Sequence, residues 1–338
     1  MNKGDSTLRV EIKTSEAAQL AEEKTDEEPK PTFLEIDELE LSDREAEDID
    51  VNHRRIKCIS KLETIPNARK LCLRNNLIKL IENLEPLAEI LVDLDLYDNQ
   101  ITKIENLDCL KVIEILDLSY NRIRTIENLD SLKSLTKLYL VNNKISTIEN
   151  LSGLHNLTML ELGSNKIRKL ENLDFFPNLE ELYVGNNKIA KLEGLDNLPK
   201  LRILSIQCNR ITKLEGLDKL VSLEELYISF NGISKIEGLD NLANLQTLEL
   251  AKNRVSRIEN IDHLHKLEEL WFNDNLVADW DQIEALVPMK QLKTLYMERN
   301  CIYFAPGSTT MDSAYRRKIL LRLPWLRQLD ATLTGVGM

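Results

Sequence analysis

The chain has 338 residues, of which 43% are apolar and 30% charged, so it can bury a sizeable hydrophobic core. No apolar run approaches the roughly 18 residues that a membrane-spanning helix needs. Residues 1–10 are polar and lack the apolar stretch of a secretory signal, so no such signal is expected. The formal net charge is -12, and 17 acidic but only 6 basic residues lie in residues 1–50, so the rest is nearly balanced. This balance argues against nucleic-acid binding, which needs a basic surface. The five cysteines form no C-x-x-C pair, which argues against a zinc site or a disulfide framework.

Residues 1–42 are rich in Glu, Asp, Lys, Thr and Ser and contain few large apolar side chains. Such a segment buries too little surface to offset the entropy of ordering, so an acidic, disordered tail is predicted. The acidic run at residues 35–50 is interspersed with Ile and Leu. It fits either a solvated tail or a short docking segment.

Residues 43–300 are an internal repeat. The pattern L-x-L-x-x-N at residues 94–99 recurs at residues 116–121, 138–143 and 160–165, and the Asn continues at intervals of 22 residues as far as Asn275. Asn76 precedes this series and Asn300 ends it, which gives eleven units. Residues 49–59 are a degenerate first unit with Arg54 in the place of the Asn.

Each unit contains two periodicities. The alternation in L-x-L predicts a short strand with both leucines on one side, and the Asn follows where the chain leaves the strand. Its amide is expected to satisfy backbone groups of the turn and to form a ladder from unit to unit. The later spacing of Ile101, Ile104, Leu107 and Leu110 suits a tight helical turn. Because one unit cannot bury its own apolar face, the units must stack. We therefore predict an α/β repeat solenoid, a leucine-rich-repeat horseshoe with a parallel concave sheet and short helical turns on the convex side.

Residues 301–338 are predicted to close the C-terminal end of the array. The segment 315–324 is amphipathic and is followed by Trp325, Leu326 and Leu329. This pattern indicates a C-terminal capping helix and a last strand-like turn over the final unit.

Function is expected where the units differ, on the outward-facing positions before, between and after the two leucines. Eleven units give 33 such positions, of which nine are acidic, six aromatic and only three basic. Exposed aromatic side chains on a rigid sheet are typical of interaction hot spots, and acidic neighbours would select a basic partner. The alternative is that the tyrosines only pack on one another. The acidic positions are Asp93, Asp95, Asp117, Glu161, Glu181, Glu225, Glu249, Glu269 and Glu298; the aromatic ones are Tyr97, Tyr139, Tyr183, Tyr227, Trp271 and Tyr296.

A second charge pattern places a basic residue two positions before a recurring Glu, as in Lys103 and Glu105. It predicts a ladder of compensating charges between adjacent coils, each pair contributing about 0–1 kcal/mol. Motifs of catalysis are missing: the sequence contains no P-loop, no G-x-G-x-x-G, no H-E-x-x-H and no G-x-S-x-G. His263 and His265 lack further ligands at a suitable spacing. We expect a protein without enzymatic activity, cofactor or metal.

The repeat with Ile-Glu-Asn-Leu or Leu-Glu-Gly-Leu, and the outward-facing residues in segments 71–78, 94–99, 138–145, 159–165 and 271–276, resemble the leucine-rich-repeat regulatory subunits of type-1 protein phosphatase. The likeness extends over residues 43–330 and includes the capping segment. It implies a non-catalytic subunit that binds the catalytic subunit of protein phosphatase 1 through the concave face and controls its activity, assembly or localisation, in nucleus and cytoplasm.

The family's contact positions fall on eight residues of this chain: Asp117, Tyr139, Glu161, Tyr183, Glu249, Glu269, Trp271 and Tyr296. Tyr139 and Tyr183 stand where Phe is usual, and Glu249 stands where Asp is usual. The chain contains no R/K-x-V/I-x-F/W docking motif, so the resemblance leaves room for a further phosphatase inhibitor in a ternary complex; no nucleic acid or membrane partner is implied. The alternative is a general leucine-rich-repeat scaffold for cytoskeletal or ribonucleoprotein complexes.

Overall fold

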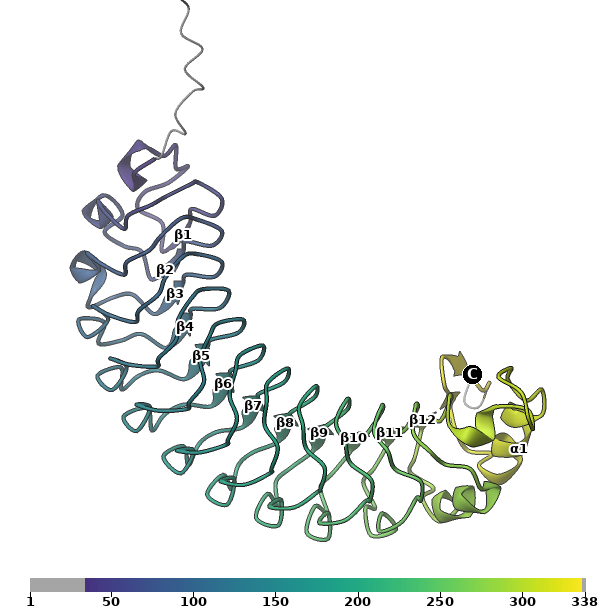
Figure 1. The fold of residues 1–338 in the computed structure, drawn as a ribbon. Coiled ribbons are helices and arrows are strands. Elements are labelled where there is room, and N and C mark those ends of the chain that lie inside the picture. The colour runs from purple at the N-terminus through teal and green to yellow at the C-terminus, as the bar shows by residue number, and fades with distance from the viewer. Residues whose placement is uncertain (1–33, 336–338) are drawn as a thin grey trace, which may run out of the picture. The chain divides into compact units, whose positions relative to one another are not determined.

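A computed structural model describes residues 34–335 of the chain. Twelve three-residue strands, one in each coil of a solenoid, follow one another along an arc, with the connecting turns on its outer margin (Figure 1). No helix in this range is long and apolar enough to cross a membrane. The strands are β1 (Asp48–Asp50), β2 (Lys70–Cys72), β3 (Asp93–Asp95), β4 (Ile115–Asp117), β5 (Lys137–Tyr139), β6 (Met159–Glu161), β7 (Glu181–Tyr183), β8 (Ile203–Ser205), β9 (Glu225–Tyr227), β10 (Thr247–Glu249), β11 (Glu269–Trp271) and β12 (Thr294–Tyr296).

The strands form one sheet in sequence order, and each pairs in parallel with the next coil. The first leucine of each L-x-L motif faces its counterpart: Leu94 is in register with Leu71 and Leu116. Both leucines of a motif are buried; Leu116 and Leu118, for example, are each 0% exposed. Burying such a side chain is worth about 1.5–3 kcal/mol, so stacking the coils supplies the stability that a single coil lacks. The predicted repeat solenoid is confirmed.

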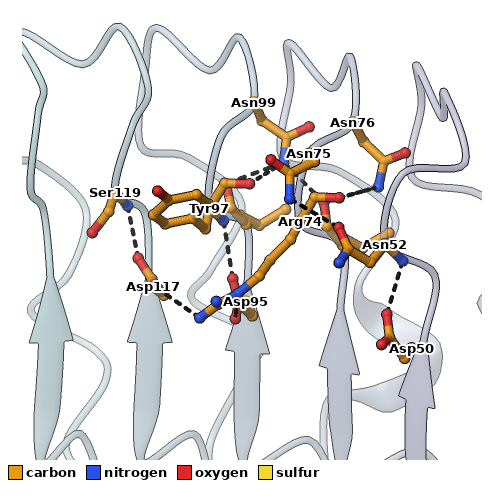
Figure 2. A network of polar contacts seen from close by, with 12 residues as sticks. Asp50, Asn52, Arg74, Asn75, Asn76, Asp95, Tyr97, Asn99, Asp117 and Ser119 are labelled. Atoms are coloured by element: carbon orange, nitrogen blue, oxygen red, sulfur yellow. Dashed lines mark hydrogen bonds and ion pairs between the residues drawn. The ribbon is translucent and has the colours of Figure 1, made fainter.

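The asparagines form the predicted ladder. The Nδ2 of Asn121 donates to the carbonyl oxygens of Leu118 and Ser119 in its own coil, at 3.1 Å each, and of Leu96 in the preceding coil, at 3.0 Å. Its Oδ1 accepts a hydrogen bond from the backbone N–H of Ile101 at 2.9 Å. Figure 2 shows Asn76 and Asn99 in the same arrangement in earlier coils. Each ladder asparagine therefore ties two coils together through buried backbone groups.

A second asparagine row was not predicted. Asn128, from the Ile-Glu-Asn-Leu motif, has a left-handed backbone with φ of 58°, and its Nδ2 donates to the carbonyl oxygen of Ile104 at 2.7 Å. Asn150 and Asn172 make the same bond to the coil before them, and Gly194 takes the equivalent place at φ of 68°. Asn and Gly tolerate this conformation better than other residues, which explains why one or the other occupies this position from Asn83 to Asn260.

The convex side is made of tight turns. The N–H groups of Leu110 and Leu132 bond to carbonyl oxygens three residues earlier, at 3.0 Å each, which is the hydrogen bond of a 3₁₀ turn. Three coils extend such turns into 3₁₀ helices: η2 (Leu62–Thr64), η3 (Glu85–Leu87) and η4 (Trp280–Leu286). The predicted helical turns are thus present, mostly as isolated turns.

The boundary predicted for the N-terminal tail at residue 42 is wrong for its last part. Residues Ile36–Glu38 form a 3₁₀ helix, η1, and Ile36 and Leu39 are 0% and 5% exposed. Arg44 fixes this segment by donating to the carbonyl oxygen of Leu39 at 2.8 Å. The two apolar side chains join the core, and this burial outweighs the acidic composition. Residues 1–33 of the predicted tail lie outside the described residues.

The charge ladder between coils is also a wrong prediction. The ion pairs form within one coil: Lys103–Glu105 at 3.3 Å, Lys191–Glu193 at 3.4 Å and Lys235–Glu237 at 3.7 Å, for instance. Residues two apart in an extended segment project to the same side, so they meet without reaching the next coil.

The C-terminal end is closed by η5 (Cys301–Tyr303), the helix α1 (Tyr315–Arg322) and the strands β13 (Gln328–Leu329) and β14 (Thr332–Leu333). Tyr315 and Ile319 of the helix are buried, as a capping helix requires. Asp330 takes the part of the strand carbonyl that the next coil supplies elsewhere, as Tyr296 does for Phe272. Its Oδ1 accepts from the N–H groups of Met297 at 2.8 Å and Glu298 at 2.9 Å. The Tyr315 hydroxyl donates to its other oxygen at 3.1 Å.

Candidate functional site: the central row of the concave face

The concave face comprises the outward side chains of the strands, and its middle line is the central row. The parallel register aligns the residue between the two leucines of each coil, so that Asp117 lies beside Tyr139, Tyr139 beside Glu161, and Trp271 beside Tyr296. Strands about 4.8 Å apart make the row from β4 to β12 roughly 40 Å long. The row reads Asp50, Cys72, Asp95, Asp117, Tyr139, Glu161, Tyr183, Ser205, Tyr227, Glu249, Trp271 and Tyr296.

Seven of the eight residues singled out from the sequence stand in this row. The eighth, Glu269, lies on the same strand as Trp271, two residues before it. Tyr227 continues the row between Tyr183 and Glu249 but was not among the eight. The repeat spacing had already placed it among the six aromatic positions of this face, because it follows Tyr183 by two repeats.

Glutamates hold three of the five aromatic side chains of the row by one recurring contact. The hydroxyl of Tyr183 donates to Glu181 at 2.8 Å, and that of Tyr227 donates to Glu225 at 2.6 Å. In β11 the indole Nε1–H of Trp271 donates to Glu269 at 3.3 Å. Each acceptor precedes its aromatic residue by two positions, so both project from the same face of the strand. These bonds fix rings that are half exposed, as a binding surface requires.

The environment shifts the ionisation of these tyrosines. Partial burial, and then the hydrogen bond to the glutamate, raise the pKa of Tyr183 and of Tyr227 above the ordinary value. Both hydroxyls therefore stay protonated and remain hydrogen-bond donors at neutral pH.

Trp271 and Tyr296 form an aromatic platform at the C-terminal end of the row. Their rings are stacked, with centroids 4.2 Å apart and an interplanar angle of 19°. The Tyr296 hydroxyl accepts a hydrogen bond from Gln328 Nε2 at 2.7 Å, so the cap orients the platform. A stacked pair is worth about 0.5–1.5 kcal/mol beyond its buried area, which keeps both rings in place before any partner arrives.

The carboxylates of the row are partly desolvated. Burial raises the pKa of Asp117 and of Glu161. Repulsion from Asp95 adds to the shift of Asp117, and repulsion from Asp117 adds to that of Glu161. Hydrogen bonds limit this cost: Asp117 accepts from the N–H of Ser119 at 2.8 Å, and Glu249 accepts from the Ser229 hydroxyl at 2.7 Å. A cationic partner would relieve the repulsion, so the row favours positive charge.

At the N-terminal end of the concave face, Arg74 connects three strands (Figure 2). Its guanidinium pairs with Asp95, lies 3.5 Å from Asp117, and covers the ring of Tyr97 at 5.1 Å from the centroid. Tyr97 in turn packs on Tyr120 with ring centroids 4.7 Å apart. Sequence reasoning counted Arg74 only as one of three basic positions. Its partners lie one and two coils away, so nothing local in the sequence signals this network.

The remaining candidates have structural explanations. The ring of His263 lies 3.0 Å from the carbonyl oxygen of Leu239 in the preceding coil and is therefore engaged with backbone. Within residues 34–335 no three His, Cys, Asp or Glu side chains are placed to hold a metal ion. Glu161, Tyr183 and Ser205 of the central row line a shallow, open hollow on the sheet.

Comparisons with known proteins agree with the architecture. Two sequence families match: one described as leucine-rich repeats in two copies, over residues 133–175, 177–219 and 199–241, and one described as leucine-rich repeat, over residues 225–333. Among solved structures, an internalin of Listeria monocytogenes, InlF, superposes with a TM-score of 0.71 at 26% identity, covering 84% of this chain and 79% of that one. The leucine-rich-repeat domain of APL1 gives a TM-score of 0.66 at 22% identity, over 85% and 73% of the two chains.

Curated relatives match over shorter segments. The chain is 52% identical over 69 residues to human protein phosphatase 1 regulatory subunit 7, which is 20% of this chain and 19% of the human protein. The Xenopus tropicalis protein of that name matches at 54% over 63 residues, 19% and 18% of the two chains. The Schizosaccharomyces pombe regulatory subunit SDS22 matches at 44% over 87 residues, 24% and 25%. The matches thus span about a fifth to a quarter of these relatives. The chain is a leucine-rich-repeat protein whose repeats are similar to those of type-1 protein phosphatase regulatory subunits.

Proposed function

We propose that this protein is a non-catalytic regulatory subunit that binds the catalytic subunit of protein phosphatase 1 through the central row of its concave face. The observation that carries the proposal is the row itself, in which the Trp271–Tyr296 platform continues into alternating aromatic and acidic side chains. The names of the similar proteins, all regulatory subunits of that phosphatase, support the choice of partner.

The geometry supports protein binding by two physical contributions. Pre-oriented rings bury a large area at little entropic cost, which makes Trp271 and Tyr296 candidate anchors. The carboxylates of Asp117, Glu161 and Glu249 select a basic surface and accelerate encounter with it. Binding along this row would control where the phosphatase is assembled and which substrates reach it. A third protein could dock on the phosphatase surface that stays free, which fits a ternary complex.

Substitution of the platform tests the proposal. Trp271→Ala and, separately, Glu269→Lys should weaken binding of the purified phosphatase catalytic subunit by at least about 2 kcal/mol, the usual threshold of a hot spot. Binding is measured by titration calorimetry with the full chain, and thermal unfolding should stay close to that of the unmodified protein, because both side chains lie at the surface.

Matched controls are Phe175→Ala and Glu89→Lys, which change an exposed aromatic and an exposed acidic residue outside the concave face. Both should bind normally. Undiminished binding by both platform variants would refute the site. Failure of the unmodified chain to bind the phosphatase, together with capture of cytoskeletal or ribonucleoprotein components from extracts, would favour the general scaffold.

A further inference from the structure

One lateral edge of the solenoid is uniformly basic. In seven consecutive coils the eight residues around the ladder asparagine contain 14 Lys or Arg and no Asp or Glu. We call this surface the basic edge. It comprises residues 119–126, 141–148, 163–170, 185–192, 207–214, 229–236 and 251–258. The contrast with the acidic concave face is notable because residues 51–338 as a whole are nearly neutral.

The hydrogen bonding of the coils aligns the cations of this edge. The backbone N–H of the residue after each ladder asparagine bonds to the coil before it: Lys144 to Ile123 and Lys166 to Ile145, at 2.8 Å each. The same bond recurs from coil to coil, so these residues form a row with steps of about 5 Å. The row consists of Arg122, Lys144, Lys166, Lys188, Arg210 and Arg254, interrupted by Gly232.

Most of these cations have no side-chain partner among the described residues. Lys169, Lys191, Lys213 and Lys235 pair with the glutamate two residues later, and Lys252 lies over the Phe230 ring at 4.4 Å. The other nine make no side-chain hydrogen bond or ion pair within residues 34–335. These nine are Arg122, Arg124, Lys144, Lys166, Arg168, Lys188, Arg210, Arg254 and Arg257. Like charges at such spacing repel one another, and a bound anion would remove this repulsion.

The surroundings restrict the shape of that anion. The concave face, with Asp117, Glu161 and Glu249, borders the edge on one side. On the other side each coil contributes the glutamate of its Ile-Glu or Leu-Glu pair, as in Glu149 and Glu171. A narrow polyanion can follow the basic row between these two acidic borders. A nucleic-acid duplex, with phosphates across its width, would be repelled by both.

Two exposed rings lie at either end of the uninterrupted part of the row, Arg122 to Arg210. Tyr120 and Phe230 occupy the position before the ladder asparagine and are 42% and 50% exposed. Five coils separate them, roughly 24 Å at the strand spacing, which an extended peptide spans with about seven residues. They offer apolar contacts to a chain whose carboxylates meet the lysines between them.

We propose that the basic edge is a docking surface for an extended acidic polypeptide segment of a partner protein. The segment lies along the row from Arg122 to Arg210 and leaves the concave face free. The protein can therefore hold a basic partner on one surface and an acidic one on the other at the same time.

The test uses the full chain and a fluorescein-labelled decaglutamate peptide, with fluorescence anisotropy as the readout. Binding should be saturable and should weaken steadily as NaCl is raised, because the contacts are exposed charges. The triple variant Lys144→Gln, Lys166→Gln, Lys188→Gln should bind roughly tenfold more weakly or worse, since it removes the middle of the row. Its thermal unfolding should be unchanged, because none of the three side chains is buried.

The matched control removes three exposed lysines outside the edge: Lys111→Gln, Lys219→Gln and Lys266→Gln. It has the same net charge and should retain affinity within roughly twofold if position matters more than total charge. Equal loss in both triple variants, no binding of decaglutamate, or equally tight binding of decauridylate would each overturn the proposal. Phosphatase binding should be the same in both triple variants, so this experiment fails or succeeds independently of the concave face.

Discussion

At the scale of single residues, the ladder asparagine shows why one amide can define a fold. Asn165 donates to the carbonyl oxygens of Leu140, Leu162 and Gly163, and its Oδ1 accepts from the N–H of Ile145. An amide is suited to this role because it combines two donors with an acceptor. The sequence made this role predictable, since a polar residue recurring beside buried leucines must have buried partners.

Replacing Asn165 by Ala should therefore lower the free energy of unfolding by about 3 kcal/mol, because several buried backbone groups lose their partners at once. Urea denaturation measures the loss. Asn178→Ala is the control. Its amide makes only solvent-exposed bonds, donating to the carbonyl oxygen of His155 at 3.2 Å and accepting from Lys200 Nζ at 2.7 Å, so the substitution should cost little. Equal effects of the two substitutions would show that the ladder does not stabilise the coils as described.

At the scale of elements, each three-residue strand contributes one or two side chains to a row, and the rows carry the interactions. Arg74 illustrates this, since it pairs with Asp95 one coil away and with Asp117 two coils away. Burial raises the pKa of Asp117, and the positive charge of Arg74 counteracts the rise. A carboxyl with a raised folded-state pKa destabilises the fold as pH rises through that pKa.

Arg74→Met should consequently raise the pKa of Asp117 further above the ordinary value of about 3.9 for Asp. The folded state of the variant then holds this proton more tightly than its unfolded state does. As pH rises from acid, the loss of stability should therefore occur at a higher pH in the variant than in the unmodified protein. Urea denaturation over a series of pH values detects the displacement. Arg69→Met, which removes a surface guanidinium 4.0 Å from Glu47, should leave the profile in place. Coincident profiles for Arg74→Met and the unmodified protein would contradict the proposed role of Arg74.

The elements also mark what sequence reasoning could and could not predict. The alternation in L-x-L assigned Tyr139, Trp271 and the other residues of the central row to one face of the sheet, because successive side chains of a strand point to opposite sides. The partners of Arg74 depend on side-chain conformation across coils, which no spacing encodes. The Lys–Glu pairs were assigned to adjacent coils because the extended path of the backbone at residues 103–105 was not foreseen. Ile36 and Leu39 were noticed but assigned to the tail, because a few apolar residues do not change the composition of an acidic segment.

At the scale of the whole array, the strand of each coil pairs only with the strands of its two neighbours. Stability is therefore largely the sum of local contacts between adjacent coils. An acidic concave face and a basic edge can therefore coexist on one array, because each surface is built from a different set of equivalent positions in successive coils. For the same reason the terminal coils are less stable than the central ones, since a terminal coil packs against one neighbour instead of two. The aromatic platform lies at such an end, beside the cap that supplies Gln328.

Loss of the cap contacts should accordingly disturb the C-terminal coils and spare the middle of the array. Asp330→Ala removes the acceptor of the Met297 and Glu298 N–H groups and the partner of the buried Tyr315 hydroxyl. Hydrogen exchange should accelerate in β12 and its neighbour β11, whereas β5 and β6 should keep their protection. Asp196→Ala, at an exposed position of a central coil, should change neither region. Uniform acceleration along all strands would show that the array unfolds as a single cooperative unit. Acceleration confined to the last coils would instead show that the cap maintains the Trp271–Tyr296 platform, and phosphatase binding should then weaken in the same variant.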